Sequence, residues 1–379
     1  MRVVVVGGGV IGLSIAWRAA VRGMAVIVVD PSPGQGTSNV AAGMLAPVTE
    51  VHYGEEALLE LNLDSSRRYP GFVAALEDAS GVATGYRASG TITVARDADD
   101  LAALDELVRF QLGLGLDVQR LGSRELRQLE PGLAPSVRGG ALVSGDHQID
   151  PRRLVSALLG ACRRRGVAVR RERAVAVRQG GVVEMESGET EAGDALVIAA
   201  GCWSAGLGAM PREMMDLPVR PVKGQILRLR GPAEQPLTTH NVRGLDVYMV
   251  SRADGEVVVG ATVEERGFDT TVTGGAVFEL LRAAVELVPE VGELALVETS
   301  AGLRPGTPDN APLLGATGVD RVVLATGHYR NGILLAPVTA DSVVELLVTG
   351  ETPPEIAPFT PRRFGWAAFD QVGFEQVTT

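Results

Sequence analysis

Three glycines near the N-terminus have the spacing of a nucleotide-binding turn. Gly7, Gly9 and Gly12 fit a G-x-G-x-x-G pattern, in which the first glycine permits a tight turn, the second lets the backbone approach a pyrophosphate and the third lets a helix pack closely on a strand. Asp30 follows at the end of the next predicted strand. A carboxylate there accepts hydrogen bonds from ribose hydroxyls and would repel a 2′-phosphate. The pattern predicts a dinucleotide site, but it does not choose between FAD and NAD.

The segments around these glycines are the ones that such a site requires. Residues 3–6 are a run of valines, which indicates a strand buried on both faces. Residues 11–22 have helical apolar spacing and end at Gly23, and residues 25–29 form a second apolar strand. The helix N-terminus would offer free N–H groups and a partial positive charge to phosphates. These segments therefore predict one βαβ half-unit.

Strand and helix patterns alternate at both ends of the chain, and strand patterns dominate the middle. This order favours an α/β fold in which a Rossmann-like nucleotide-binding domain is interrupted by an α+β domain with a mixed or antiparallel sheet. We expect the first domain to comprise residues 1–48, 139–215 and 300–365, the second to comprise residues 49–138 and 216–299, and the C-terminal tail to comprise residues 366–379. Predicted helices include a long one over residues 55–81, kinked near Pro70, and a last one over residues 332–347.

Composition excludes several classes of protein. The 46 acidic residues outnumber the 35 Lys and Arg residues and give a formal net charge of −11, which argues against nucleic acid and anionic membranes as partners. No stretch reaches the ~18 apolar residues of a membrane span, and the apolar run at residues 3–6 is too short for a secretory signal. The two cysteines, Cys162 and Cys202, form neither a disulfide framework nor a metal-ligand pattern. We therefore expect a cytoplasmic protein without a metal.

Five further segments carry a resemblance to a known family. They are residues 41–45 (AAGML), 221–225 (PVKGQ), 258–262 (VVGAT), 301–307 (AGLRPGT) and 327–337 (GHYRNGILLAP). In this order, along nearly the whole chain, they resemble the glycine oxidase branch of the D-amino-acid oxidase family of flavoproteins. The resemblance implies that the first domain binds FAD and that the second binds substrate. The small residues that end the apolar strand at 196–201 also favour a large cofactor.

The resemblance assigns the cofactor contacts to separate regions of the chain. Thr37, Ser38 and residues 42–44 match a loop that wraps the pyrophosphate and passes beside the isoalloxazine ring. Val175 matches a backbone contact to the adenine, and residues 328–334 match a segment along the pyrimidine edge of the flavin. Asn331 and Gly332 are expected to begin a helix whose positive end favours flavin reduction; an ordinary helix cap is the alternative. The expected cofactor-binding residues are Gly7, Gly9, Val10, Ile11, Gly12, Asp30, Pro31, Thr37, Ser38, Ala42, Gly43, Met44, Val175, Ala200, Gly201, His328, Arg330, Asn331, Gly332, Ile333 and Leu334.

The resemblance also implies four substrate contacts. Arg304, in a predicted turn at residues 302–305, matches a carboxylate clamp, in which a guanidinium donates two parallel hydrogen bonds of roughly 1.5–3 kcal/mol each. Tyr248 matches a phenol bonded to the same carboxylate. Arg330 matches a residue beside the amino group, where its backbone carbonyl should matter at least as much as its side chain. Val263 matches a position that limits the room for a side chain, although core packing explains it equally well. A core tyrosine and surface ion pairs are the alternatives for the other three.

The implied reaction is oxidation of a small amino acid (glycine, also sarcosine or D-alanine) to its imine, with hydride transfer to flavin and reduction of O2 to H2O2. The imine would supply thiazole synthesis for thiamin. We expect no catalytic side chain, because the lone pair of the deprotonated amine drives the hydride out. The absence of a cysteine after Cys202 removes the C-terminal thiol to which related sarcosine-type oxidases bond flavin, so FAD should be non-covalent.

The family resemblance further implies a homo-oligomer, a tetramer. Two other functions remain open at this point. One is a D-amino-acid dehydrogenase or oxidase that acts on larger substrates, and the other is a non-catalytic protein that holds FAD without turnover.

Overall fold

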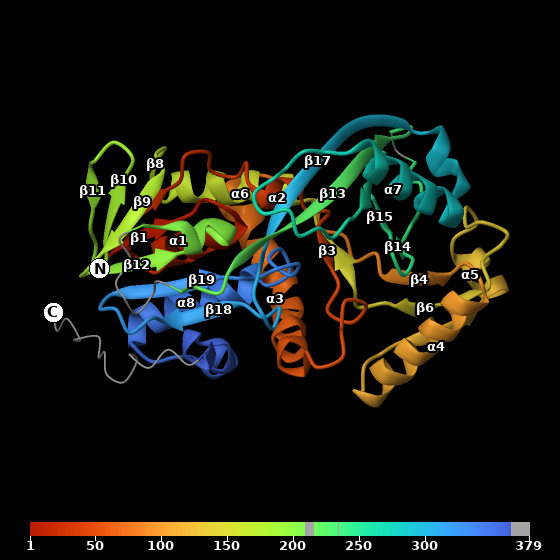
Figure 1. The fold of residues 1–379 in the computed structure, drawn as a ribbon, viewed down its shortest axis with the longest axis horizontal. Helices are drawn as coiled ribbons and strands as arrows, with labels where there is room; N and C mark the ends of the chain where they lie inside the picture. Colours follow the sequence, from red (N-terminus) through yellow and green to blue (C-terminus); the bar gives the residue numbers. More distant parts are fainter. Residues whose placement is uncertain (209–215, 234, 365–379) are drawn as a thin grey trace.

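The computed structural model describes residues 1–208, 216–233 and 235–364, and in this part of the chain two sheets lie side by side along the long axis of the molecule (Figure 1). The first sheet contains β1 (Arg2–Val6), β2 (Ala25–Val29), β8 (Ala168–Arg170), β12 (Ala195–Ile198), β18 (Leu313–Ala316) and β19 (Val322–Thr326). Its order is β18-β19-β12-β1-β2-β8. All neighbours are parallel except β18 and β19, as expected of a Rossmann-like sheet with an antiparallel edge strand.

Four helices surround this sheet: α1 (Val10–Val21), α3 (Glu56–Ser80), α6 (Pro151–Arg164) and α8 (Ala336–Thr349). Their apolar faces share one core with Val3 and Val5 of β1. The N-terminus of α6 follows the sequence signal, because the Asp150 carboxylate accepts hydrogen bonds from two backbone N–H groups of the first turn and Pro151 is the first helical residue. A smaller antiparallel sheet of β9 (Ala174–Arg178), β10 (Val182–Met185) and β11 (Thr190–Glu191) lies beside the first one.

The second sheet has eight strands. They are β4 (Thr91–Ala95), β5 (Gln119–Gly122), β6 (Gly139–Val143), β13 (Arg220–Arg230), β14 (Asn241–Arg243), β15 (Tyr248–Ser251), β16 (Glu256–Gly260) and β17 (Ala295–Gly306), in the order β17-β13-β16-β15-β14-β4-β6-β5. All pairs are antiparallel except β14 and β4. Helices α4 (Ala98–Gly113), α5 (Ser123–Leu129) and α7 (Gly274–Leu287) lie at this end of the molecule (Figure 1). The predicted fold class is therefore confirmed.

Two local predictions near the site are wrong. The last helix begins at Ala336, not Gly332: residues 332–335 form a turn, and Pro337 marks the true first turn of α8. The predicted turn at residues 302–305 is part of β17, in which Arg304 pairs with Val222 of β13. Glycine and proline weaken the strand signal in this segment, but β17 is an edge strand, where proline is tolerated.

The predicted domain division remains a proposal, and it departs from the two sheets at two elements. Helix α3, which we expected in the second domain, packs in the core of the first sheet, and β6, which we expected in the first domain, pairs within the second sheet. The predicted tail at residues 366–379 and the end of the 139–215 segment lie outside the described residues. Among the helices that the structure describes, none has the length and apolar character needed to cross a bilayer.

Candidate active site

A cavity of about 940 Å³ lies between the loops of the first sheet and the strands of the second. This volume is within the range of ligand sites, ~300–1,000 Å³. Of the predicted site residues, all except Gly12 and Val175 line it, namely Gly7, Gly9, Val10, Ile11, Asp30, Pro31, Thr37, Ser38, Ala42, Gly43, Met44, Ala200, Gly201, Tyr248, Val263, Arg304, His328, Arg330, Asn331, Gly332, Ile333 and Leu334. Residues far apart in the sequence are thus brought to one cavity.

The glycine turn is shaped by close backbone packing. Gly7 has a φ of +109°, and a Cβ atom there would lie 2.3 Å from the Ala199 carbonyl oxygen. Gly12 does not line the cavity, because it faces the turn itself: a Cβ atom would lie 1.9 Å from the Gly7 carbonyl oxygen. Any larger residue at either position would push α1 away from β1 or β12. The first and third glycines therefore have the packing roles that the motif predicts.

Asp30 fixes the same turn. Its Oδ2 accepts a hydrogen bond from the Gly8 N–H at 2.7 Å, and its Oδ1 accepts one from the Ser32 N–H at 2.7 Å. An ionised carboxylate has about four lone-pair sites, so further acceptor capacity faces the cavity that Asp30 lines. The carboxylate can therefore hold the turn and accept ribose hydroxyls at the same time.

The remaining cofactor-end residues fit a pyrophosphate and a flat ring. The first turn of α1 lines the cavity at Gly9, Val10 and Ile11, where a helix offers unpaired N–H groups to an anion. Ser38 stabilises this turn, because its Oγ accepts the Val10 N–H at 3.1 Å. The small side chains of residues 41–43 and 199–201 leave room for a ring beside the backbone. This cradle fits FAD.

The adenine contact of Val175 remains a prediction. Its carbonyl oxygen already accepts the Gly208 N–H at 2.7 Å, and its neighbour Ala174 lines the cavity instead. The carbonyl oxygen keeps a second lone pair and the N–H group is a donor, so both remain candidates for the contact.

The segment at residues 328–334 is held from behind by α3. The Tyr69 phenol donates to the Ile333 carbonyl at 2.9 Å, and the Ser65 hydroxyl donates to the Leu334 carbonyl at 2.6 Å. His328 is buried, and burial lowers its pKa to about 3, so its imidazole is neutral. Apart from the ion-paired Arg330, the segment therefore presents neutral groups to the cavity, without the helix N-terminus that the sequence suggested.

Two glycines on neighbouring strands make room for the predicted clamp. Arg304 of β17 lies over Gly224 of β13, where a Cβ atom would be 2.4 Å from the Arg304 guanidinium. Tyr248 of β15 lies over Gly260 of β16, where a Cβ atom would be 2.4 Å from the phenol oxygen. Arg304 Nη1 also donates to the Thr262 carbonyl at 3.0 Å. The sheet thus holds both side chains flat against its cavity face.

Sequence reasoning missed a group of charged residues at the substrate end. Arg243 lines the cavity directly across the strand pair from Tyr248, and it contacts Glu50, which also lines the cavity. The same Glu50 carboxylate lies 3.4 Å from Arg330 Nε, and Arg330 Nη2 lies 2.6 Å from Glu55 Oε2. If β14 and β15 had been recognised as a hairpin, their pairing would have placed Arg243 opposite Tyr248. However, β14 has only three residues, which is too short for an alternating strand pattern to be visible in the sequence. Glu50 had no signal in the sequence.

These ion pairs leave one guanidinium free at the substrate end. Arg243 and Arg330 are compensated by Glu50 and Glu55, whereas Arg304 has no carboxylate within ion-pair distance among the residues that the structure describes. Val263 is 67% exposed and lines the cavity, so the core-packing alternative for it is wrong. The substrate end therefore offers a single uncompensated positive charge to an anionic group.

Comparisons with known proteins agree with this geometry. The chain matches a family described as FAD dependent oxidoreductase (DAO) over residues 2–346. It is 37% identical to the bifunctional protein ThiO/ThiG of Synechocystis sp., over 96% of this chain and 54% of that protein, so it spans about half the length of that relative. It is 35% identical to glycine oxidase of Geobacillus kaustophilus, over 95% of this chain and 96% of that enzyme. The crystal structure of glycine oxidase from that organism superimposes with a TM-score of 0.87 at 34% identity, covering 95% of this chain and 98% of that one.

Proposed function

The chain belongs to the DAO family of FAD-dependent oxidoreductases, and we propose that within this family it oxidises glycine and other small amino acids. It is an amino acid oxidase of the glycine oxidase type with FAD as its cofactor. The observation that carries the choice of substrate is the single uncompensated guanidinium of Arg304 beside the Tyr248 phenol. A small molecule with one carboxylate matches that charge.

Arg304 and Tyr248 would bind and orient the substrate. A guanidinium can grip a carboxylate through two parallel bonds, and the phenol adds a third. Holding the carboxylate in this way fixes the adjacent Cα–H relative to the cofactor, and such orientation can supply most of the rate gain. When bound, FAD accepts the hydride equivalent from Cα and passes the electrons to O2, which gives H2O2.

The side chain of Arg330 is occupied by ion pairs, so its backbone is the part that remains for the substrate. Its guanidinium is engaged by Glu50 and Glu55, which supports a contact of its carbonyl oxygen with the substrate amino group. Both carboxylates are likewise engaged by guanidinium groups. An ion-paired carboxylate is a poor trap for an ammonium ion, so the amine can lose the proton that it must lose before oxidation.

The same charged residues favour a small substrate. An apolar side chain pressed against Arg243 and Glu50 would remove water from both groups and return no hydrogen bond, which is costly. Glycine, sarcosine and D-alanine avoid or minimise this cost. We therefore expect the preference to fall as the apolar side chain grows.

Peroxide release by purified, FAD-loaded protein in aerated buffer tests this function. Glycine, sarcosine and D-alanine are compared side by side with D-leucine. Peroxide from glycine at a rate comparable to or above that from D-alanine supports the proposal. Silence on the small substrates with turnover of D-leucine, or with an artificial electron acceptor, would replace it with a D-amino-acid oxidase or dehydrogenase. Bound FAD that none of these amino acids reduces would indicate a non-catalytic protein.

Four further expectations follow from the sequence; three of them rest on the family resemblance, and the location in the cytoplasm rests on composition. The imine of glycine would be consumed in thiazole synthesis for thiamin, which the similarity to a protein named ThiO/ThiG supports. The chain would bind FAD non-covalently, act in the cytoplasm and assemble as a tetramer. Acid precipitation that releases free FAD and size-exclusion chromatography of the holoprotein test the second and the last of these.

A further inference from the structure

A segment that lines the cofactor end of the cavity is held by its carbonyl groups. Residues 39–42 comprise the end of α2 (Thr37–Val40) and the start of its connection to β3 (Met44–Leu45), and residues 40–42 line the cavity. The last carbonyls of a helix have no partner within the helix. In this segment the carbonyls of four consecutive residues, 39–42, accept hydrogen bonds from arginine side chains.

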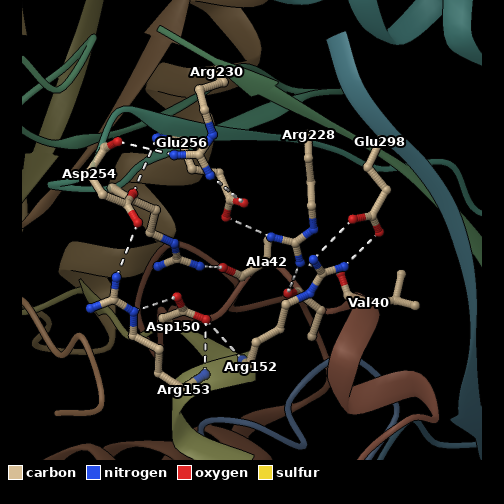
Figure 2. Close-up of polar contacts among 12 residues, drawn as sticks. Val40, Ala42, Asp150, Arg152, Arg153, Arg228, Arg230, Asp254, Glu256 and Glu298 are labelled. Carbon is tan, nitrogen blue, oxygen red and sulfur yellow. Dashed lines mark hydrogen bonds and ion pairs between the residues drawn. The ribbon is translucent and has the colours of Figure 1, made fainter. Parts of the chain in front are cut away.

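Three arginines supply these bonds, and two of them, Arg228 and Arg152, are labelled in Figure 2. Arg228 Nη2 lies 3.4 Å from each of the carbonyl oxygens of residues 39–41. Arg252 Nη2 donates to the Ala42 carbonyl, and its Nη1 donates to the Ile149 carbonyl at 2.8 Å. Arg152 Nε donates to the carbonyl of residue 39 at 3.0 Å. One face of the segment is therefore fixed by guanidinium groups while the other faces the cavity.

Carboxylates aim two of these guanidinium groups. Arg228 is only 1% exposed, and its Nη1 lies 2.7 Å from Glu256 Oε1. Arg152 makes a bidentate pair with Glu298, at 2.6 and 3.0 Å. Figure 2 shows Arg228 and Arg152 converging on the segment, whereas Arg230 and Arg153 point to Glu256, Asp254 and Asp150. A buried guanidinium is stable only when such partners satisfy it.

The arginines that hold the segment come from the strands that carry the substrate clamp. Arg228 lies on β13, the strand that also carries Gly224, the glycine that makes room for Arg304. Arg252 directly follows β15, which begins at Tyr248. Glu298 lies on β17 together with Arg304. A displacement of the sheet would therefore move the clamp and the cofactor-facing segment together.

We propose that Arg228, Arg252 and Arg152 are positioning residues that set the place of the flavin relative to the carboxylate clamp without touching either ligand. The inference requires only that the cavity binds FAD. It does not depend on glycine being the substrate.

The chain offers matched controls for a test. Arg228→Gln and Arg152→Gln each remove a guanidinium bonded to the segment. Arg230→Gln, two residues along the same strand, and Arg153→Gln, on the same helix, remove guanidinium groups that contact only residues outside the segment. Titration of each apoprotein with FAD gives the dissociation constant, and the visible absorption spectrum reports the surroundings of the bound flavin.

We expect the two test variants to raise the FAD dissociation constant roughly ten- to a hundredfold, as loss of charge-assisted bonds implies, and to shift the flavin absorption bands. At saturating FAD, kcat should fall more than KM changes, because the clamp itself is intact. The controls should match the wild type. The conservative variant Arg228→Lys keeps a cation facing Glu256 but lacks the forked guanidinium group. It should restore folding but only part of the affinity for FAD.

Two results would overturn the proposal. Test variants that bind FAD within about twofold of the wild type, with an unchanged spectrum, would show that the arginines do not position the segment. Equal losses in test and control variants would show a general contribution to stability. If Arg228→Gln does not fold, Arg152→Gln still decides the question, because the Arg152 side chain is only partly buried.

Discussion

The two ends of the cavity are built in different ways. The cofactor end consists mainly of backbone: a glycine turn, the first turn of α1 and loops of small residues, with Asp30 bonded to N–H groups of the turn. The substrate end consists of long polar side chains: Arg243, Tyr248 and Arg304 come from β14, β15 and β17, and Arg330 comes from the segment at residues 328–334. Arg243 and Arg330 pair with Glu50 and Glu55. One end depends on close backbone approach and the other on the balance of charges.

This difference implies different sensitivities. A site made of backbone is damaged by added atoms, since an extra methyl group has nowhere to go. A site made of paired charges is damaged by removal of one partner, which leaves the other buried and uncompensated. Substitutions at the two ends should therefore differ in what they affect: folding and FAD retention at one end, KM and substrate choice at the other.

Gly12→Ala should have the largest effect. Its new Cβ atom would lie 1.9 Å from the Gly7 carbonyl oxygen, so the helix must shift at a cost of ~1–3 kcal/mol or more, and the FAD cradle is lost with it. We expect little or no holoprotein, measured as the FAD-to-protein ratio after purification together with the thermal midpoint. Gly113→Ala, in α4 with open space around its Cβ, should stay within about 1 kcal/mol of the wild type. Equal behaviour of the two variants would contradict the packing argument.

Arg304→Ala should have the next largest effect, confined to the other end. Loss of two charge-assisted hydrogen bonds of roughly 1.5–3 kcal/mol each should lower kcat/KM for glycine by at least about a hundredfold, chiefly through KM. FAD content should not change. Steady-state kinetics with glycine measure the effect, and Arg220→Ala, on the exposed end of the adjacent strand, is the control. Unchanged glycine kinetics in Arg304→Ala would remove the clamp assignment.

The contrast also explains what the sequence could predict. The glycine turn, β1, α1 and Asp30 are encoded within one local stretch, and the structure has each where the pattern indicated. The predicted turn at residues 302–305 is wrong because Gly302 and Pro305 hide the signal of β17, and the predicted last helix begins four residues before α8. Arg243 and Glu50 were missed because their importance arises only when distant segments meet. Local backbone chemistry is visible in a sequence, whereas charge pairing across a fold is not.

Asp30→Ala should weaken the cofactor end without unfolding it. The substitution removes the acceptors of the Gly8 and Ser32 N–H groups and the predicted ribose contact, so the FAD dissociation constant should rise roughly ten- to a hundredfold. Fluorescence titration of the apoprotein with FAD measures it. Asp320→Ala, at an exposed carboxylate, is the control and should bind FAD normally. Normal binding by Asp30→Ala would show that the ribose contact is dispensable.

Glu50→Gln should change substrate choice more than turnover. Without this carboxylate, Arg243 loses its partner and Arg330 keeps only Glu55, so a second guanidinium becomes available to an anion. We expect kcat/KM for glycine to fall about tenfold, since a carboxylate can now bind in the wrong place, while the ratio of D-aspartate to glycine rises. Comparing both substrates in parallel measures this ratio. Glu56→Gln, at an exposed neighbouring position, is the control and should leave the ratio unchanged. An unchanged ratio in Glu50→Gln would show that charge balance does not set substrate choice.

Tyr248→Phe should have the smallest effect, because it removes one neutral donor and keeps the ring over Gly260. A hydrogen bond of about 1 kcal/mol corresponds to a loss of roughly fivefold in kcat/KM. Burial raises the pKa of the phenol above its ordinary value of about 10, against an opposing effect of Arg304. The phenol therefore stays protonated, and remains a donor, throughout the neutral and mildly alkaline range. The ratio of wild-type to Tyr248→Phe activity should consequently be constant from pH 7 to about pH 10. A ratio that falls within this range would show that the phenol ionises in the site, and would assign it a role other than donation to the carboxylate.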